Sequence, residues 1–326
     1  MLIHRLRANP WAVLGVMCLG LFMALLDTTI VNIAVPSIIE CLDAKFDEIL
    51  WVLNAYILAY AALLITGGRL GDIFGPRNLF VAGLALFTAA SALCGIAQDP
   101  SQLIAARALQ GVGGALMTPQ MLAVITGLFP PERRGVAFAV PGAVGGLAVA
   151  VGPTLGDLLV TNFGWPSIFF VNVPVGAAAI TLALLVTSDL RPDRRHRLDV
   201  VGVLLVTAGL FGITFGLIEG ERYDWGTVFS FVTILGTIVA GIVLMQIFLL
   251  NQYLRQEKEP LLPFAIFRDH PRCARRDSVA GRLALASPSG KSKAQRDLTG
   301  RGEPHEGEIS GRWAVDDTRL RKETSA

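Results

Sequence analysis

Long apolar runs constrain this chain more than any other feature of its sequence. Eight of them recur along it, each close to the roughly 17–25 residues that a helix needs to cross the hydrocarbon layer of a bilayer. In that layer only helices and closed barrels satisfy their backbone hydrogen bonds, and these runs show no strand-like alternation. The sequence therefore predicts an all-α, polytopic membrane protein. The expected spans are Trp11–Val35, Leu50–Gly67, Leu79–Ile96, Leu103–Leu128, Val136–Val160, Ser167–Val186, Val200–Ile218 and Val228–Leu250.

The composition is that of a membrane protein, so we expect the lipid bilayer to be a partner of this chain. Of its 326 residues 53% are hydrophobic and 17% are charged, whereas about a quarter of a soluble domain is charged. The net charge of +2 is too small to indicate a nucleic-acid partner. No span combines a nucleophile, a base and an orienting group, so we expect no enzyme. The scattered cysteines predict neither a disulfide framework nor a metal site: Cys18, Cys41, Cys94 and Cys273.

Short breaks with helix-stopping residues separate the runs. They are Gly75-Pro76, Asp99-Pro100, Pro130-Pro131 and Trp165-Pro166. Proline has no N–H to continue a helical hydrogen-bond ladder, so a helix boundary is expected at each break.

The basic residues of the loops predict an orientation. If the N-terminus and every second loop are cytoplasmic, that side holds ten of them and the opposite side two. Cytoplasmic loops of membrane proteins are enriched in Lys and Arg, so we expect both termini inside the cell. The first span lacks a small-residue cleavage site, which argues for a retained helix over a removed signal peptide. The ten are Arg5, Arg7, Arg69, Arg77, Arg133, Arg134, Arg191, Arg194, Arg195 and Arg197, and the two are Lys45 and Arg222.

Three charged side chains fall inside the expected spans. A charge near the middle of a span costs about 2.5–3.5 kcal/mol on insertion scales, so each requires a reason. At about 1.5 Å of rise per residue, Asp27 lies about 24 Å from the inner edge and Arg107 about 6 Å from the outer edge. In a hydrocarbon layer about 30 Å thick these are nearly one depth, so the two could pair, or each could face a wet cavity. Asp157 falls at the outer boundary, where water can solvate it.

Two readings of the Asp27 and Arg107 charges follow. They are a helix-packing ion pair without a transport role, or a protonatable carboxylate and a cation that line a polar path. In the second reading a low dielectric disfavours the carboxylate and the nearby arginine favours it, so that movement of either group would change protonation.

Glycine clusters in the fourth and fifth spans form a further signal. Small residues four positions apart let helices approach closely. Gly111, Gly113 and Gly114 form one such cluster, and Gly152-Pro153 is more specific, because a proline inside a span removes a hydrogen bond and kinks the helix. We expect a glycine-lined, bent fifth helix.

In these residues the chain resembles the major facilitator superfamily, and within it the fourteen-helix drug:proton antiporters. The first span carries Leu26 through Pro36, which is similar to that branch's first-helix motif. Gly68 through Arg77 resembles the superfamily's loop between helices two and three, and Arg107 with Gln110-Gly111 resembles its fourth-helix motif. Gly152-Pro153-Thr154-Leu155-Gly156 resembles the fifth-helix motif of exporters. Further matches are Trp51 with Ala55-Tyr56, and Trp165 with Asn172-Val173-Pro174-Val175-Gly176.

The resemblance implies a proton-coupled secondary transporter that expels small hydrophobic or cationic drugs, with no cofactor. It implies a six-helix domain over residues 1–190 and two extra helices within 191–260. The residues it assigns to proton coupling or the substrate path are Asp27, Asn32, Arg107 and Gln110. Those it assigns to a cytoplasmic gate are Gly68, Asp72, Gly75 and Arg77. Those it assigns to the helix-five kink are Gly152, Pro153 and Gly156.

The chain also departs from that pattern. Ile73 and Pro76 stand where basic residues are usual, and Ala148 and Asp157 where glycines are usual. No second six-helix domain follows, and residues 261–326 are polar and aperiodic, as expected of a disordered cytoplasmic tail or of a shifted reading frame. Three functions therefore stay open: an exporter by descent, a non-transporting membrane remnant or scaffold, and self-association in which two copies supply both halves.

Overall fold

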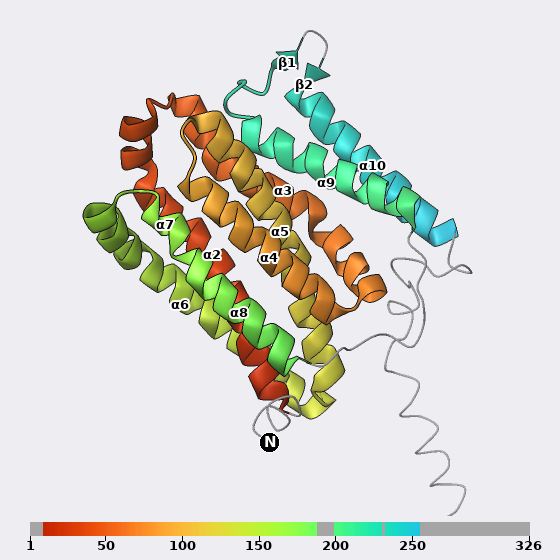
Figure 1. Cartoon of the computed structure of the whole chain (residues 1–326). Coiled ribbons are helices and arrows are strands. Elements are labelled where there is room, and N and C mark those ends of the chain that lie inside the picture. The colour runs from red at the N-terminus through yellow and green to blue at the C-terminus, as the bar shows by residue number, and fades with distance from the viewer. Residues whose placement is uncertain (1–8, 188–198, 230–231, 255–326) are drawn as a thin grey trace, which may run out of the picture. The chain divides into compact units, whose positions relative to one another are not determined.

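The computed structural model describes residues 9–187, 199–229 and 232–254, and these contain eight helical segments long and apolar enough to cross a membrane (Figure 1). This confirms the predicted number and class of spans. The expected boundary between 190 and 191 and the tail from 261 onward lie outside the described residues. The elements are α2 (Pro10–Leu42), α3 (Phe46–Phe74), α4 (Pro76–Gly95), α5 (Pro100–Leu128), α6 (Pro131–Phe163), α7 (Ser167–Phe170), α8 (Asn172–Val186), α9 (Val200–Glu219), β1 (Thr227–Phe229), β2 (Val232–Thr233) and α10 (Ile234–Leu254).

Proline and aspartate set several of the helix starts. Proline at the first helical position loses no hydrogen bond and already has a helical φ. The carboxylate of Asp99 accepts from the backbone N–H of Gln102 at 3.0 Å, which satisfies one free donor of the α5 N-terminus. The predicted breaks between the second and fifth spans are thereby confirmed as helix boundaries. The helices that start with proline are α2, α4, α5 and α6.

The sixth span is interrupted between α7 and α8, at Val171. Pro174 has no N–H, so the carbonyl of Phe170 cannot receive the usual helical hydrogen bond from it. Trp165-Pro166 precedes the span, and the N–H of Phe170 donates to the carbonyl of Pro166 at 3.1 Å. The span therefore enters the bundle as one short turn followed by a regular helix.

The predicted start of the eighth span was wrong. Residues 227–229 and 232–233 form an antiparallel pair of short strands, in which Thr227 faces Thr233, and α10 begins only at Ile234. The hydroxyl of Thr233 accepts from the N–H of Gly236 at 3.0 Å and caps the helix there. Hydropathy alone does not distinguish a short β-branched strand from the first turn of a span.

The predicted loop over Gly68–Arg77 is also wrong in its extent. Helix α3 continues to Phe74, and only Gly75 separates it from α4. Gly75 has φ +88°, a conformation that favours glycine. Arg69 and Asp72 pair at i, i+3 with 3.2 Å between Nη1 and Oδ2, so the polar residues here extend the helix.

The apolar core forms two layers along the bundle. One contains Met17, Phe87 and Met117, and the other contains Ile38 and Leu103. On α2 the first layer ends at Ala24 and the second begins at Ile30, and α5 crosses the two layers in the opposite order. Figure 1 shows α4 and α5 side by side, and α2 beside α6 and α8. The residues between the two layers on each helix therefore meet in the middle of the bundle.

Helices α9 and α10 form a hairpin whose first helix packs on α3 (Figure 1). The hydroxyls of Thr66 and Thr207 share a hydrogen bond of 2.8 Å. Near the end of α9, Arg222 pairs with Asp47 of α3 at 3.0 Å and with Glu219 at 3.1 Å. Polar contacts thus join this hairpin to the other helices.

Glycines on α5 allow close contact with both neighbouring helices. A Cβ at Gly111 would lie 2.4 Å from the carbonyl oxygen of Tyr56 on α3. A Cβ at Gly113 would lie 2.6 Å from the backbone nitrogen of Phe87 on α4. Both distances are shorter than real Cβ contacts, so the predicted role of these glycines in close packing is confirmed.

We expect Gly113→Ala to destabilise the protein by about 1–3 kcal/mol, because the added methyl group would force α4 and α5 apart. Gly127→Ala is the matched control, since it lies on the same helix and a Cβ there meets no atom within 4 Å. The control should be neutral or up to about 1 kcal/mol stabilising. Reversible unfolding in mixed micelles measures both. Equal effects of the two substitutions would contradict the packing described above.

Candidate functional site

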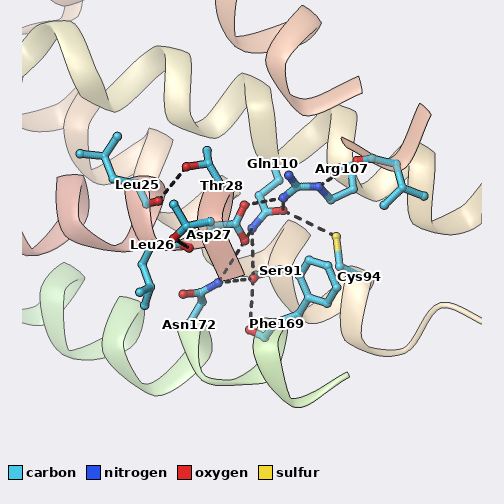
Figure 2. Close-up of polar contacts among 12 residues, drawn as sticks. Leu25, Leu26, Asp27, Thr28, Ser91, Cys94, Arg107, Gln110, Phe169 and Asn172 are labelled. Carbon is cyan, nitrogen blue, oxygen red and sulfur yellow. Dashed lines mark hydrogen bonds and ion pairs between the residues drawn. The ribbon is translucent and has the colours of Figure 1, made fainter. Parts of the chain in front are cut away.

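A cluster of buried polar side chains fills the space between the two apolar layers. It takes members from α2, α4, α5 and α8, and each of them is at most 2% exposed (Figure 2). In a membrane-spanning bundle such groups are costly unless they satisfy one another. The members are Asp27, Ser91, Cys94, Arg107, Gln110 and Asn172.

An ion pair between Asp27 and Arg107 lies at the centre of the cluster. Nη1 of Arg107 donates to Oδ2 of Asp27, and Nε donates to the carbonyl oxygen of Val52 at 3.2 Å. The guanidinium carbon lies 4.6 Å from the ring centroid of Tyr56, close enough for a cation–π contact. These additional contacts offset part of the desolvation cost of the pair.

Gln110 uses its whole hydrogen-bonding capacity in the cluster. Its Nε2 donates to Oδ1 of Asp27 at 2.8 Å and to Oγ of Ser91 at 3.2 Å. Its Oε1 accepts from Nη1 of Arg107 at 2.6 Å and from Sγ of Cys94 at 3.7 Å. An ionised carboxylate only accepts, which fixes the orientation of this amide.

Ser91 connects the ion pair to the interrupted sixth span. Its hydroxyl donates to the carbonyl oxygen of Phe169 at 3.1 Å, and Asn172 Nδ2 donates to the same hydroxyl at 3.0 Å. Nδ2 of Asn172 also lies 3.5 Å from Oδ1 of Asp27. Figure 2 shows Ser91 between the amides and the Phe169 carbonyl. The cluster is therefore continuous from α2 to the junction of α7 and α8.

The structure decides between the two arrangements that the sequence left open for the buried charges. Asp27 and Arg107 pair directly, and both are closed off from solvent in this conformation. Gln110 belongs to the same cluster. Asn32 does not, because its exposed side chain donates to the carbonyl of Thr28 on its own helix at 3.0 Å. Asp157 is exposed on α6.

Sequence reasoning missed Ser91 and Cys94 as members of the site, and it quoted Asn172 and the adjoining Tyr56 only within motifs. Each is an uncharged side chain in an apolar span, which is a weak signal by itself. The signal that could have found Ser91 is its position along the span, because it lies where α4 passes from one apolar layer to the other.

The residues of the expected gate lie apart from this cluster. Asp72 accepts from Arg69, whereas Arg77 Nη2 donates to the carbonyl oxygen of Leu184 in the last turn of α8 at 2.8 Å. Gly68 lies within α3, where a Cβ would be 3.7 Å from Cβ of Pro119. Arg77 thus satisfies a carbonyl at a helix C-terminus, and a gating role for this group stays a prediction.

The fifth-helix motif packs directly against α2, beside the cluster. A Cβ at Gly152 would lie 2.0 Å from Oγ1 of Thr29, and one at Gly156 2.9 Å from Cγ1 of Ile30. Pro153 is exposed, and Ala148 is fully buried although glycine is the residue expected there. The tight contact with the helix that carries Asp27 is therefore retained.

In the described part of the chain, eight apolar helices of membrane-spanning length, together with this buried polar cluster, define a multi-pass membrane protein. A family model described as "Major Facilitator Superfamily" matches residues 17–267. The chain belongs to the Major Facilitator Superfamily.

Curated relatives agree with this assignment. The chain is 46% identical over 80% of its length to an uncharacterised MFS-type transporter of Mycobacterium tuberculosis, of which it covers 44%. It is 38% identical over 82% of its length to the tetracenomycin C resistance and export protein of Streptomyces glaucescens, of which it covers 48%. It is 36% identical over 79% of its length to the methylenomycin A resistance protein of Bacillus subtilis, of which it covers 54%. The chain thus spans about half the length of these relatives.

A solved structure shows the same fold. The POT family transporter PepTSo is 14% identical, with a TM-score of 0.51, and the match covers 74% of this chain and 52% of that one. At this level of identity the likeness concerns the helix arrangement alone.

Removing one charge from the cluster should leave the other buried without a partner. We expect Arg107→Leu to cost on the order of 3–5 kcal/mol of folding free energy. The double variant Asp27→Leu with Arg107→Leu should lose clearly less than the sum of the two single variants. Unfolding in mixed micelles gives this cycle. Simple additivity of the two single effects would contradict a coupled ion pair.

Proposed function

We propose that this chain forms the proton-exchanging half of a secondary transporter that exports small hydrophobic or cationic drugs in exchange for protons. The observation that carries the proposal is the buried Asp27–Arg107 pair. It lies between two apolar layers of a membrane-spanning bundle, where a charge without a function would be costly. No cofactor is required, because the proton gradient supplies the energy.

The arrangement of the pair suits proton exchange. Asp27 is stabilised as a carboxylate by Arg107, Gln110 and Asn172, which all donate to it. A conformational change that separates it from Arg107 while it stays in the apolar layer would favour the neutral acid. Proton uptake and helix movement would then be linked in both directions.

The relatives support export as the direction of transport. Two of them are described as antibiotic resistance or export proteins of Streptomyces and Bacillus. Transporters of this kind place the substrate site between two repeats of the fold, at the middle of the bilayer. The part of the chain that the structure describes contains one such bundle and the α9–α10 hairpin.

The second candidate is a non-transporting membrane scaffold. It is favoured by the length comparison, since the chain spans about half of each relative described above. In that case the ion pair would serve only to hold α2 against α5.

Asp27→Asn tests the proposal where the rest of the transporter is present. We expect it to abolish proton-driven drug efflux when residues 1–254 are grafted onto the remaining part of a full-length relative, because the amide cannot exchange a proton. Efflux is measured in energised inverted vesicles. Asp157→Asn is the matched control, because this carboxylate is exposed on the neighbouring α6.

Undiminished efflux by the Asp27→Asn graft would remove this carboxylate from coupling. The 326-residue chain expressed alone should confer no efflux. Efflux by that chain that an uncoupler abolishes would instead mean that it transports without a second bundle.

We further propose that both termini are cytoplasmic, as the loop arginines indicate. Cys41 is exposed at the end of α2 and should be on the outer face. In a Cys273→Ser background, a membrane-impermeant maleimide should label Cys41 on intact cells. Glu132→Cys, combined with Cys41→Ser, should be labelled only after permeabilisation. The reverse pattern would invert the orientation.

A further inference from the structure

The donor and acceptor roles in the hydrogen bonds around Ser91 are all fixed. A serine hydroxyl has one hydrogen to donate and two lone pairs to accept. Ser91 donates to the carbonyl oxygen of Phe169, so Gln110 and Asn172 must both present N–H groups to it, at 3.2 and 3.0 Å. The same amide groups donate to Oδ1 of Asp27. The one donor and both acceptor sites of Ser91 are therefore in use. This assignment of donors and acceptors is the one that an ionised Asp27 requires.

Protonation of Asp27 would make this arrangement inconsistent. The carboxylic acid gains an O–H that needs an acceptor, yet both of its oxygens face N–H donors. Turning the Gln110 amide would place its NH₂ group against the permanently charged Arg107. Turning the Asn172 amide meets no such conflict. It directs Oδ1 of Asn172 at both Asp27 and Ser91, and this oxygen can accept from both hydroxyl groups.

That rotation has a consequence at the sixth span. If the Ser91 hydroxyl donates to Asn172, it no longer donates to Phe169. The Phe169 carbonyl belongs to the junction of α7 and α8, which is already interrupted and where Pro174 removes a helical donor. The junction would therefore lose its side-chain hydrogen bond when Asp27 binds a proton and regain it when the proton leaves.

We propose that Asn172 and Ser91 form a relay that couples the charge of Asp27 to the junction of α7 and α8. The proposal rests on proton exchange at Asp27, as proposed above. Asn172 and Ser91 are positioning residues, because they neither take up the proton nor touch a substrate. The proton comes from water and returns to it, so that no other reactant is required.

Several other titratable groups lie around Asp27. α5 contributes Arg107, α3 contributes Tyr56 with Tyr60 beside it, and α4 contributes Cys94. α8 faces Asp27 with the neutral Asn172. On α6 the glycine face meets α2, and its acidic residue Asp157 is exposed. Among the described residues around Asp27, Gln110 and Asn172 both contact the carboxylate and Ser91. Of these two amides, Gln110 is held by Arg107, so Asn172 is the one that can turn.

Trp165 provides a reporter for this junction. It is 5% exposed, and its ring centroid lies 6.2 Å from that of Phe169. The experiment uses the full chain in lipid nanodiscs with every other tryptophan replaced by phenylalanine. Two quantities are followed during a pH titration: Trp165 emission, and the infrared band of the protonated Asp27 carboxyl, assigned by its loss in Asp27→Asn. The replaced tryptophans are Trp11, Trp51, Trp225 and Trp313.

The relay predicts that emission and the carboxyl band change together in the parent chain. In Ser91→Ala and in Asn172→Leu the carboxyl band should still titrate, and the emission change should be lost. The Asp27→Asn variant should show constant emission across the titration. Thr88→Val is the matched control and should behave as the parent does. The Thr88 hydroxyl lies one turn away on α4 and donates to the carbonyl of Leu84 on its own helix.

Three outcomes would overturn the relay. The first is a carboxyl band that titrates in the parent chain while the Trp165 emission stays constant. The second is a Trp165 emission change of equal size in the parent, in Ser91→Ala and in Asn172→Leu. In both cases the relay is wrong and proton exchange at Asp27 stands. If no carboxyl band appears at any pH at which the chain stays folded, proton exchange fails and the relay fails with it. Far-UV circular dichroism identifies unfolded variants, and either substitution in the relay suffices for the test.

Discussion

The buried contact between Asp27 and Arg107 is the interaction on which the rest of this structure depends. An isolated charge in an apolar bundle would be excluded, so each of these residues requires the other. Their contact fixes the register of α2 against α5, and Gln110 and Ser91 extend the same constraint to α4. The two apolar layers pack on either side of this polar group. The cluster thus specifies how the helices meet, and glycine allows them to come close enough.

This combination suits a protein that must change shape. Apolar packing between helices is adaptable, whereas a satisfied polar cluster has few alternative arrangements. When its charge changes, the cluster must reorganise as a whole, because Gln110 and Ser91 have no spare hydrogen-bonding capacity. A single proton can therefore have an effect on several helices. The interruption between α7 and α8 is where the backbone can move most easily, because the helical hydrogen bonds are already broken there.

The sequence predicted the spans well because their signals are local. Apolar length and proline breaks are properties of neighbouring residues, and so is the rise per residue that placed Asp27 and Arg107 at one depth. The start of α10 was missed because the strand residues Val228, Phe229 and Val232 are apolar enough to continue a span. Ser91 and Asn172 were not predicted as site residues because their contacts depend on how each helix is rotated, and hydropathy carries no such information. The gate motif was predicted as a loop because its charged residues end the apolar run, whereas α3 continues to Phe74.

The central claim is that Asp27 exchanges a proton although it is enclosed within the bundle. The ¹³C chemical shift of its carboxyl carbon, followed through a pH titration of the membrane-embedded chain, tests this most directly. The account predicts that the resonance moves between the positions of a carboxylate and a carboxylic acid, and that Arg107→Leu displaces the midpoint. A resonance that stays at the carboxylate position over the whole range in which the protein is folded would contradict it and leave a purely structural ion pair.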